Sequence, residues 1–413
     1  MKPTQVNIAR LQKEIDDLAL ITEAAPSVVT RVLFSESDLR GRAFVKNLCR
    51  KARLALREDA AGNIFVRWEG LDKNLPAIAT GSHIDAIPNA GKYDGVVGVL
   101  GALEAIRALQ AAGFQPKRSI ELIIFTSEEP TRFGIGCLGS RLLGGVLSLE
   151  RAAALRDRDG KDLEHWRNQG GCNGTLDSVK LPKDCYAAFI ELHIEQGPIL
   201  EAENMDIGVV EKIAAPSTLR LQLTGVGGHA GATLMPGRRD ALLASAEIAL
   251  AVETAATTTG SPDTVGTTGV FRIEPGAVNS VPCRAWLEID LRDTLAKTRD
   301  AALVQIEAAV KEICARRKIE FTMERLNLDP HAICDAKLVE TTVSVAHKLK
   351  FSAKIMISRA YHDSLFMAQV CPTTMIFIPC LKGYSHRPDE FSSPEQIEKG
   401  VRVLAETLAE LAG

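Results

Sequence analysis

The sequence lacks any window that approaches the roughly 18 consecutive apolar residues of a membrane-spanning helix. Its first segment, MKPTQVNIARLQKEIDDLALI, carries charges throughout and lacks the apolar core of a secretory signal. Lysine and arginine number 49 against 52 aspartates and glutamates, so no excess of basic residues favours nucleic acid or an anionic membrane. We therefore expect a cytoplasmic protein that binds neither and that holds any anionic substrate with a few local cations.

The nine cysteines lack any pairing pattern. They are odd in number, scattered along the chain and never in CxxC spacing. This usage is typical of reduced thiols in a cytosolic protein and argues against a disulfide framework. We expect each cysteine to be a small buried hydrophobic side chain.

The order of expected elements divides the 413 residues, which are too many for one ordinary core, into two domains. The first part alternates strands and helices, and polar residues follow the strands, which predicts an α/β sheet with a ligand site at its carboxyl edge. From residue 214 the order becomes βαββαβ, typical of a small two-layer domain. We predict an α/β catalytic domain with a mixed central sheet, 1–213 and 328–413, and an inserted ferredoxin-like domain, 214–327.

Side chains that could hold metal ions follow two of the expected strands. His83 ends the first strand, and Asp85, two residues later, could accept its second ring N–H and fix its tautomer. Asp94 lies in a glycine-flanked turn before a helix. The adjacent Glu128 and Glu129 are costly unless a cation or proton offsets their charge, so Glu129 could bind metal while Glu128 moves protons. Each of these residues also has a purely structural interpretation. His83 could be a hydrogen-bonded core histidine, Asp94 could cap a helix, and the two glutamates could form a solvated acidic turn.

Two further histidines extend this pattern. His193 lies in the apolar strand segment IELHIEQGP, and His386 lies in the loop segment GYSHRPDE. Alone, the first could be a core residue and the second a surface residue. Their joint occurrence with the acids, at strand ends and in loops, predicts a metal site. Histidine and carboxylate ligands without cysteine suit Mn²⁺ or Zn²⁺.

Several segments, taken together, resemble the M20 metallopeptidase clan. They are HIDAIPNAGKYDG, SEEP, ELHIEQGP, GGHAGATLMPGRRDAL and YSHRPDE. ELHIEQGP and GGHAG are similar to its carbamoyl-amide branch, which comprises allantoate, N-carbamoyl-L-amino acid and ureidoglycolate amidohydrolases. SEEPTRFGIGCLGSR and RAYHDSLFMAQ look most like the ureidoglycolate group, because the other groups usually have glycine at Pro130 and a small residue at Tyr361.

The resemblance implies two divalent ions that share Asp94. His83 and His193 would be the other ligands of one ion. Glu129 and His386 would be the other ligands of the second ion. The resemblance favours Mn²⁺, with Zn²⁺ possible.

The resemblance also implies how a small anionic ureide would be held. The inserted domain would form a homodimer and act as a lid, and His229 would reach the partner subunit's site to stabilise an oxyanion. Asn279 and Arg292 would bind the substrate carboxylate, which the arginine fork suits. Gln196 and His362 would assist.

The expected reaction is hydrolysis of ureidoglycolate to glyoxylate, ammonia and CO₂. Two ions would turn a bridging water into hydroxide and polarise the ureido carbonyl, while Glu128 acts as general base. Tyr361 would fill the room that the second ureido group of allantoate needs. Allantoate or an N-carbamoyl-L-amino acid stays open as the substrate. An aminopeptidase would need a feature that recognises a free amine, and a metal-free scaffold would need none of these ligands.

Overall fold

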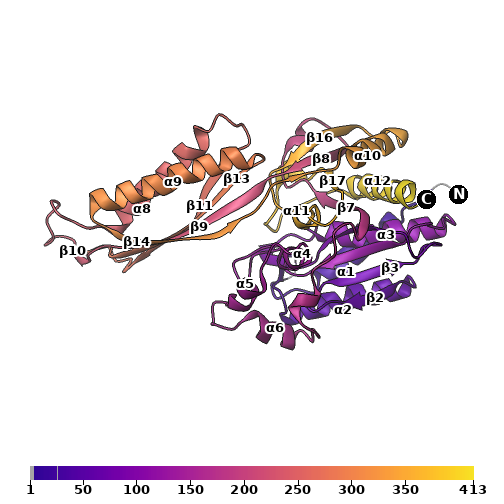
Figure 1. Cartoon of the computed structure of the whole chain (residues 1–413), viewed down its shortest axis with the longest axis horizontal. Helices are drawn as coiled ribbons and strands as arrows, with labels where there is room; N and C mark the ends of the chain where they lie inside the picture. The colour runs from indigo at the N-terminus through magenta and orange to yellow at the C-terminus, as the bar shows by residue number, and fades with distance from the viewer. Residues whose placement is uncertain (1–3, 26) are drawn as a thin grey trace. The chain divides into compact units, whose positions relative to one another are not determined.

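The computed structural model describes residues 4–25 and 27–413, and its contacts divide the chain into two compact units. The first unit comprises Met1–Glu211 and Ile333–Gly413, and the second comprises Lys212–Ala332. In sequence, the second unit is thus an insertion into the first. Each unit has its own sheet (Figure 1). Each also has its own hydrophobic core.

A nine-stranded mixed sheet forms the centre of the first unit. Eight strands follow the order β15-β8-β17-β7-β4-β6-β3-β2, and β16 pairs with β8. β17, β7, β4 and β6 run parallel and their residues are almost all buried, as strands covered on both faces should be. The strands are β2 (Ala55–Glu58), β3 (Ile64–Trp68), β4 (Ala77–His83), β6 (Ile120–Phe125), β7 (Tyr186–Ile194), β8 (Ile207–Ile213), β15 (Ala332–Ile333), β16 (Ala353–Ser358) and β17 (Thr373–Ile378).

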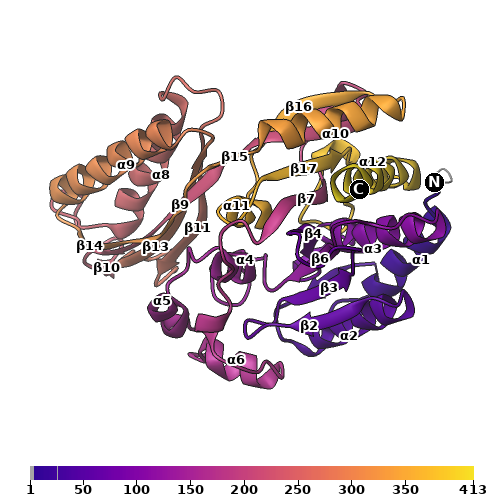
Figure 2. The ribbon, with the colours of Figure 1, turned by 45° about the vertical axis from the view of Figure 1, so that its right-hand side comes forward.

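Helices cover both faces of this sheet (Figure 2). On one face, α3 (Val96–Ala111) and α12 (Pro394–Ala412) pack against β4 and β7. α3 is apolar nearly all round, as a buried helix should be. On the other face, α4 (Leu138–Leu143) and α11 (Asp363–Met367) join a core with residues of β6 and β7. The mixed sheet between helices confirms the predicted α/β class.

Shorter elements surround this core. β1 and β5 form a separate antiparallel pair. The remaining elements of the first unit are α1 (Ile8–Ala19), β1 (Val29–Arg31), α2 (Glu36–Lys51), β5 (Ala86–Ala90), α5 (Leu149–Ala154), α6 (Leu163–Gln169), η1 (Leu176–Ser178), α7 (Ile199–Ala202), α10 (Ala336–Lys348) and η2 (Leu381–Gly383).

The second unit is a four-stranded antiparallel sheet with helices on one face. Its strand order is β11-β13-β9-β14, and its burial alternates along the strands, as expected for a sheet with one covered face. A short ribbon, β10 with β12, extends from it. The chain order confirms the predicted βαββαβ pattern. The elements are β9 (Ala215–Thr224), β10 (Gly228–His229), α8 (Ala241–Thr257), β11 (Val265–Glu274), β12 (Ser280–Val281), β13 (Arg284–Asp293), α9 (Ala296–Arg317) and β14 (Glu320–Leu328).

The cysteines and the helices have the properties that the sequence predicts. All nine cysteines are free, and each is buried or half-buried. Across residues 4–25 and 27–413, every helix is too short or too polar to cross a membrane.

Candidate metal centre

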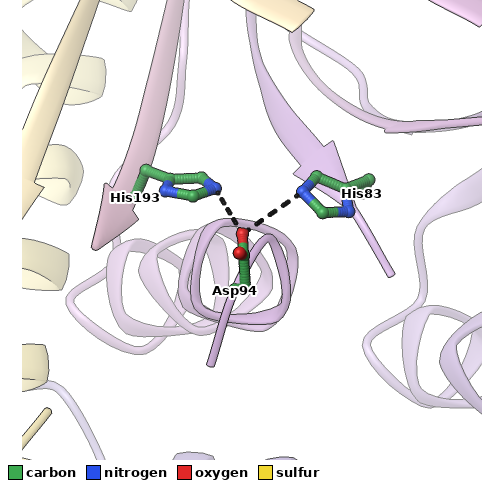
Figure 3. A group of neighbouring side chains, drawn as sticks. All are labelled: His83, Asp94 and His193. Atoms are coloured by element: carbon green, nitrogen blue, oxygen red, sulfur yellow. Dashed lines mark ion pairs between the residues drawn. The ribbon is translucent and has the colours of Figure 1, made fainter. Parts of the chain in front are cut away.

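Five side chains that the sequence identified as metal ligands lie at one edge of the first unit's sheet. β4 and β7 are parallel neighbours, so His83 at the end of β4 and His193 near the end of β7 emerge close together. Asp94 lies just before α3, and its carboxylate points between the two imidazole rings (Figure 3). Glu129 follows β6, and His386 lies in the loop between β17 and α12.

The carboxylate of Asp94 faces two separate groups of side chains. Its Oδ1 lies 3.2 Å from Nε2 of His193 and 3.6 Å from Nε2 of His83. Its Oδ2 lies 3.3 Å from Nε2 of His386, which in turn lies 3.3 Å from Oε1 of Glu129. Each group keeps its ligand atoms within 4.8 Å of one another, so each could hold a cation.

These spacings fit metal coordination. Ligand atoms about 2.1 Å from one ion in a tetrahedral arrangement lie roughly 3.4 Å apart. Nδ1 of His83 lies 3.1 Å from the main-chain oxygen of Asp85, and Nδ1 of His193 lies 2.9 Å from that of Ile194. These carbonyls place the ring proton on Nδ1 and leave Nε2 as the coordinating lone pair. Nε2 of His83 is buried and has no hydrogen-bond partner among the residues that the structure describes.

The site concentrates negative charge in a buried place. Burial raises the pKa of Asp85 to about 7 and that of Glu128 well above its usual range. Burial alone would lower the pKa of His83, but Glu128 and Asp94 raise it well above its usual value. Hydrogen bonds with Asp94 and Glu129 raise the pKa of His386 to about 11. The carboxylates therefore favour positive charge at this position, which a divalent cation supplies.

Asp85 acts differently from the sequence expectation. β4 ends at His83, so the chain turns before Asp85 and the alternation of a strand no longer applies. His83 bonds the main-chain oxygen of Asp85, and the nearer carboxylate oxygen is 3.6 Å from the ring nitrogen. The carboxylate accepts the backbone N–H groups of Glu128 (3.2 Å) and Glu129 (3.0 Å). Asp85 thereby fixes the turn that carries the acidic pair.

Sequence reasoning missed the residues that hold Asp94. Oε1 of Glu390 accepts the backbone N–H of Asp94 at 3.0 Å and of Tyr93 at 2.8 Å. The Ser385 hydroxyl lies 2.7 Å from Oδ2 of Asp94 and 3.1 Å from Oε2 of Glu390. A Cβ on Gly91 would lie 2.5 Å from Cβ of Glu390, which explains this glycine. Glu390, the last residue of the segment YSHRPDE, was the available signal in the sequence. Its partner Asp94 lies almost 300 positions away along the chain.

Two of the expected substrate-binding residues lie beside the ligands. Nε2 of Gln196 donates to Oδ2 of Asp94 at 2.7 Å. The buried ring of His362 packs on that of His193, with centroids 4.4 Å apart. Both side chains thus line the same edge of the sheet as the candidate ligands.

Tyr361 lies against the loop that follows the acidic pair. A Cβ on Gly136 would lie 2.4 Å from the Tyr361 hydroxyl oxygen and 2.7 Å from the main-chain oxygen of Glu128. The tyrosine ring therefore occupies space that a side chain at position 136 would need. This contact brings Tyr361 close to the turn that holds Glu128.

The other three expected residues lie in the second unit. His229 is exposed on β10, and its Nδ1 accepts the backbone N–H groups of Gly231 (3.2 Å) and Ala232 (3.3 Å). Asn279 lies beside this ribbon, where its main-chain oxygen accepts the N–H of Ala230. Nε of Arg292 donates to Oδ1 of Asp290 at 2.6 Å. Their contribution to a site stays a prediction.

The fold and the two groups of candidate ligands are those of a family of metal-dependent hydrolases. The sequence pattern of peptidase family M20/M25/M40 matches residues 79–410, and the chain belongs to this family. This membership confirms the resemblance seen in the sequence. The chain is a hydrolase that acts on carbon–nitrogen bonds.

Individual relatives are similar over almost the whole chain. Ureidoglycolate hydrolase of Arabidopsis thaliana is 53% identical over 414 residues, which cover 98% of this chain and 87% of that protein. Ureidoglycolate hydrolase of Oryza sativa subsp. japonica is 51% identical, covering 99% of this chain and 86% of that protein. The crystal structure of AtUAH in complex with glyoxylate matches with a TM-score of 0.94 and 52% identity, covering 99% of this chain and 98% of that chain.

If Asp94 serves both ligand groups, its charge should be required for metal binding. Asp94→Asn should weaken the binding of divalent ions at least about 100-fold, because both groups lose the negative charge and one of them faces an N–H donor in place of an oxygen. Metal content after dialysis, measured by mass spectrometry, checks this. Asp159→Asn makes the same chemical change at a side chain that is 65% exposed and should keep the wild-type metal content. Full metal retention by Asp94→Asn would contradict the site.

Proposed function

We propose that this chain hydrolyses ureidoglycolate, a small anionic ureide, with two divalent ions bound at the two ligand groups. The main support is geometric: two groups of candidate ligands share Asp94 and lie beside Glu128. In addition, the chain is 53% identical to ureidoglycolate hydrolase of Arabidopsis thaliana. AtUAH has been crystallised with glyoxylate and with (S)-hydroxyglycine. Addition of water to the ureido carbonyl would release one ammonia, CO₂ and hydroxyglycine, and hydroxyglycine would then lose its single nitrogen as a second ammonia to give glyoxylate.

The candidate ligands divide between the two ions as follows. His83 and His193 would hold one ion, Glu129 and His386 the other, and Asp94 both. When bound, the ions would lower the pKa of a water molecule and polarise the ureido carbonyl. Histidine and carboxylate ligands suit both Mn²⁺ and Zn²⁺. We place Mn²⁺ first because the family resemblance favours it.

Glu128 is the proposed general base. Its Oε2 lies 3.7 Å from Nε2 of His83, at the edge of the ligand groups, and its side chain is 8% exposed. Burial raises its pKa, which makes it a stronger base than a carboxylate in water. Glu128 would take the proton of the attacking water and deliver it to the departing nitrogen. Asp85, bound to the Glu128 backbone, keeps it in place.

The second unit is our candidate for a dimerisation and lid domain. Because Nδ1 of His229 accepts two backbone N–H groups, its proton belongs on the exposed Nε2, which suits a donor to an oxyanion in a partner subunit. Arg292 and Asn279 would bind the substrate carboxylate, with Gln196 and His362 assisting. Arg292 would then share its guanidinium with Asp290. Nine free cysteines accord with a cytoplasmic location, which we also propose.

A substrate panel tests the proposed activity. With Mn²⁺ supplied, ammonia release should be faster from ureidoglycolate than from allantoate or N-carbamoyl-L-amino acids. The comparison uses kcat/KM for each compound on the same enzyme preparation. A preference for allantoate or an N-carbamoyl-L-amino acid would leave the metal site intact and refute the substrate assignment.

The role of Glu128 predicts a loss of turnover without a loss of metal. Glu128→Gln keeps the side-chain shape but cannot take up a proton, so kcat should fall at least about 100-fold. Metal content should remain that of the wild-type enzyme. Glu36→Gln, at a side chain that is 85% exposed, is the matched control and should leave kcat unchanged. A fully active Glu128→Gln enzyme would remove Glu128 from its role.

Tyr361 should select against allantoate by the size of its ring. Tyr361→Ala should raise the ratio of kcat/KM for allantoate to that for ureidoglycolate by about tenfold, because it opens room for a second ureido group. Tyr361→Phe keeps the ring and should preserve the ratio. An unchanged ratio in Tyr361→Ala would show that other residues determine this selectivity.

A further inference from the structure

The buried Cys137 makes a polar contact with the carboxylate of Glu128. The thiol of Cys137 donates a hydrogen bond to Oε1 of Glu128 across 3.5 Å, and the cysteine is 0% exposed. The other oxygen, Oε2, faces Nε2 of His83 at 3.7 Å. The two oxygens of Glu128 therefore have different neighbours, a thiol on one side and the ligand groups on the other.

Main-chain bonds fix the position of this thiol. The N–H groups of Cys137, Leu138 and Gly139 donate in turn to the carbonyls of Glu128, Ser127 and Thr126, at 2.7, 2.8 and 2.8 Å. The two segments thus run closely side by side. Cys137 adopts the left-handed conformation (φ 54°) just before α4, which directs its side chain while the backbone remains bonded to Glu128.

The tight fit of this segment leaves little freedom for movement. A Cβ on Gly139 would lie 2.1 Å from Oδ1 of Asn63 and 2.7 Å from the backbone nitrogen of Thr126. Asn63 also bonds that nitrogen at 2.9 Å. The loop carrying Cys137 is therefore held against the end of β6, from which the acidic pair extends.

We propose that Cys137 is a positioning residue that holds the carboxylate of Glu128 with Oε2 directed at the reacting water. The inference rests on the proposed function of Glu128 as general base. With Oε1 bound to the thiol, rotation of the carboxylate is restricted, and Oε2 is the oxygen left to take up the proton. When a catalytic base is misplaced by about 1 Å, the rate of the catalysed step falls strongly.

The test compares three variants of the full-length enzyme loaded with metal. Cys137→Ala removes the donor, and Cys137→Ser restores a donor of similar size. Both keep a Cβ, so the left-handed backbone is no more strained than with cysteine. Cys49→Ala is the matched control, because Cys49 is also 0% exposed and its sulfur makes no hydrogen bond with the described residues. The readouts are kcat, KM, metal content and Tm.

We expect kcat of Cys137→Ala to fall about tenfold while KM and metal content stay at wild-type values. Cys137→Ser should recover kcat to within about threefold of wild type. Cys49→Ala should lower Tm, as loss of a buried side chain does, and leave kcat unchanged. This combination separates positioning of the base from a general loss of packing.

Two outcomes would overturn the inference. One is a wild-type kcat in Cys137→Ala, and the other is a Cys137→Ser enzyme as slow as Cys137→Ala, which would assign the loss to volume. Failure of the proposed function looks different, since the wild-type enzyme would then release no ammonia from ureidoglycolate. In that case the same three variants are compared on the carbamoyl compound that the wild-type enzyme hydrolyses, and absence of any hydrolysis would overturn both proposals.

Discussion

The site in the first unit depends on the shared carboxylate of Asp94. Its two oxygens face different histidines, His193 on one side and His386 on the other, at 3.2 and 3.3 Å. A buried carboxylate that meets imidazoles on both sides is stable only if positive charge accompanies it. The fold supplies this arrangement because parallel strands end at one edge, so that residues far apart in the sequence meet around one acid.

Around this carboxylate, a second set of residues fixes the backbone that carries the candidate ligands. Glu390 holds the main chain at Asp94, and Asp85 holds the turn with the acidic pair. The buried Arg31 donates to the main-chain oxygen of Ile84 at 2.6 Å, directly beside His83. Each of these contacts joins a ligand segment to a remote part of the chain. The ligand geometry is therefore a property of the folded unit and not of short motifs.

This division explains what the sequence could predict. His83, His193 and Glu129 were recognisable as candidates because they lie at or just after the ends of apolar strands, and parallel strands bring their ends together. The α/β class and the βαββαβ order followed from the same periodicity. Glu390, Ser385 and the bond of Asp85 to the acidic pair were not recognisable. They depend on where loops turn after the strands end, and the hydrophobic pattern carries no information about loop paths.

The surroundings of Glu128 suit the general base that we propose, which would both gain and lose a proton. Asp85 holds its backbone, and the Cys137 thiol contacts its carboxylate. An arginine or lysine in the place of Cys137 would favour the charged carboxylate strongly and lower its pKa. A thiol is a weak, uncharged donor, so it restrains the direction of the carboxylate with little preference between its charged and neutral forms. Cysteine at this position is therefore compatible with the proposed role of Glu128, in which the charge of the carboxylate would change twice in every turnover.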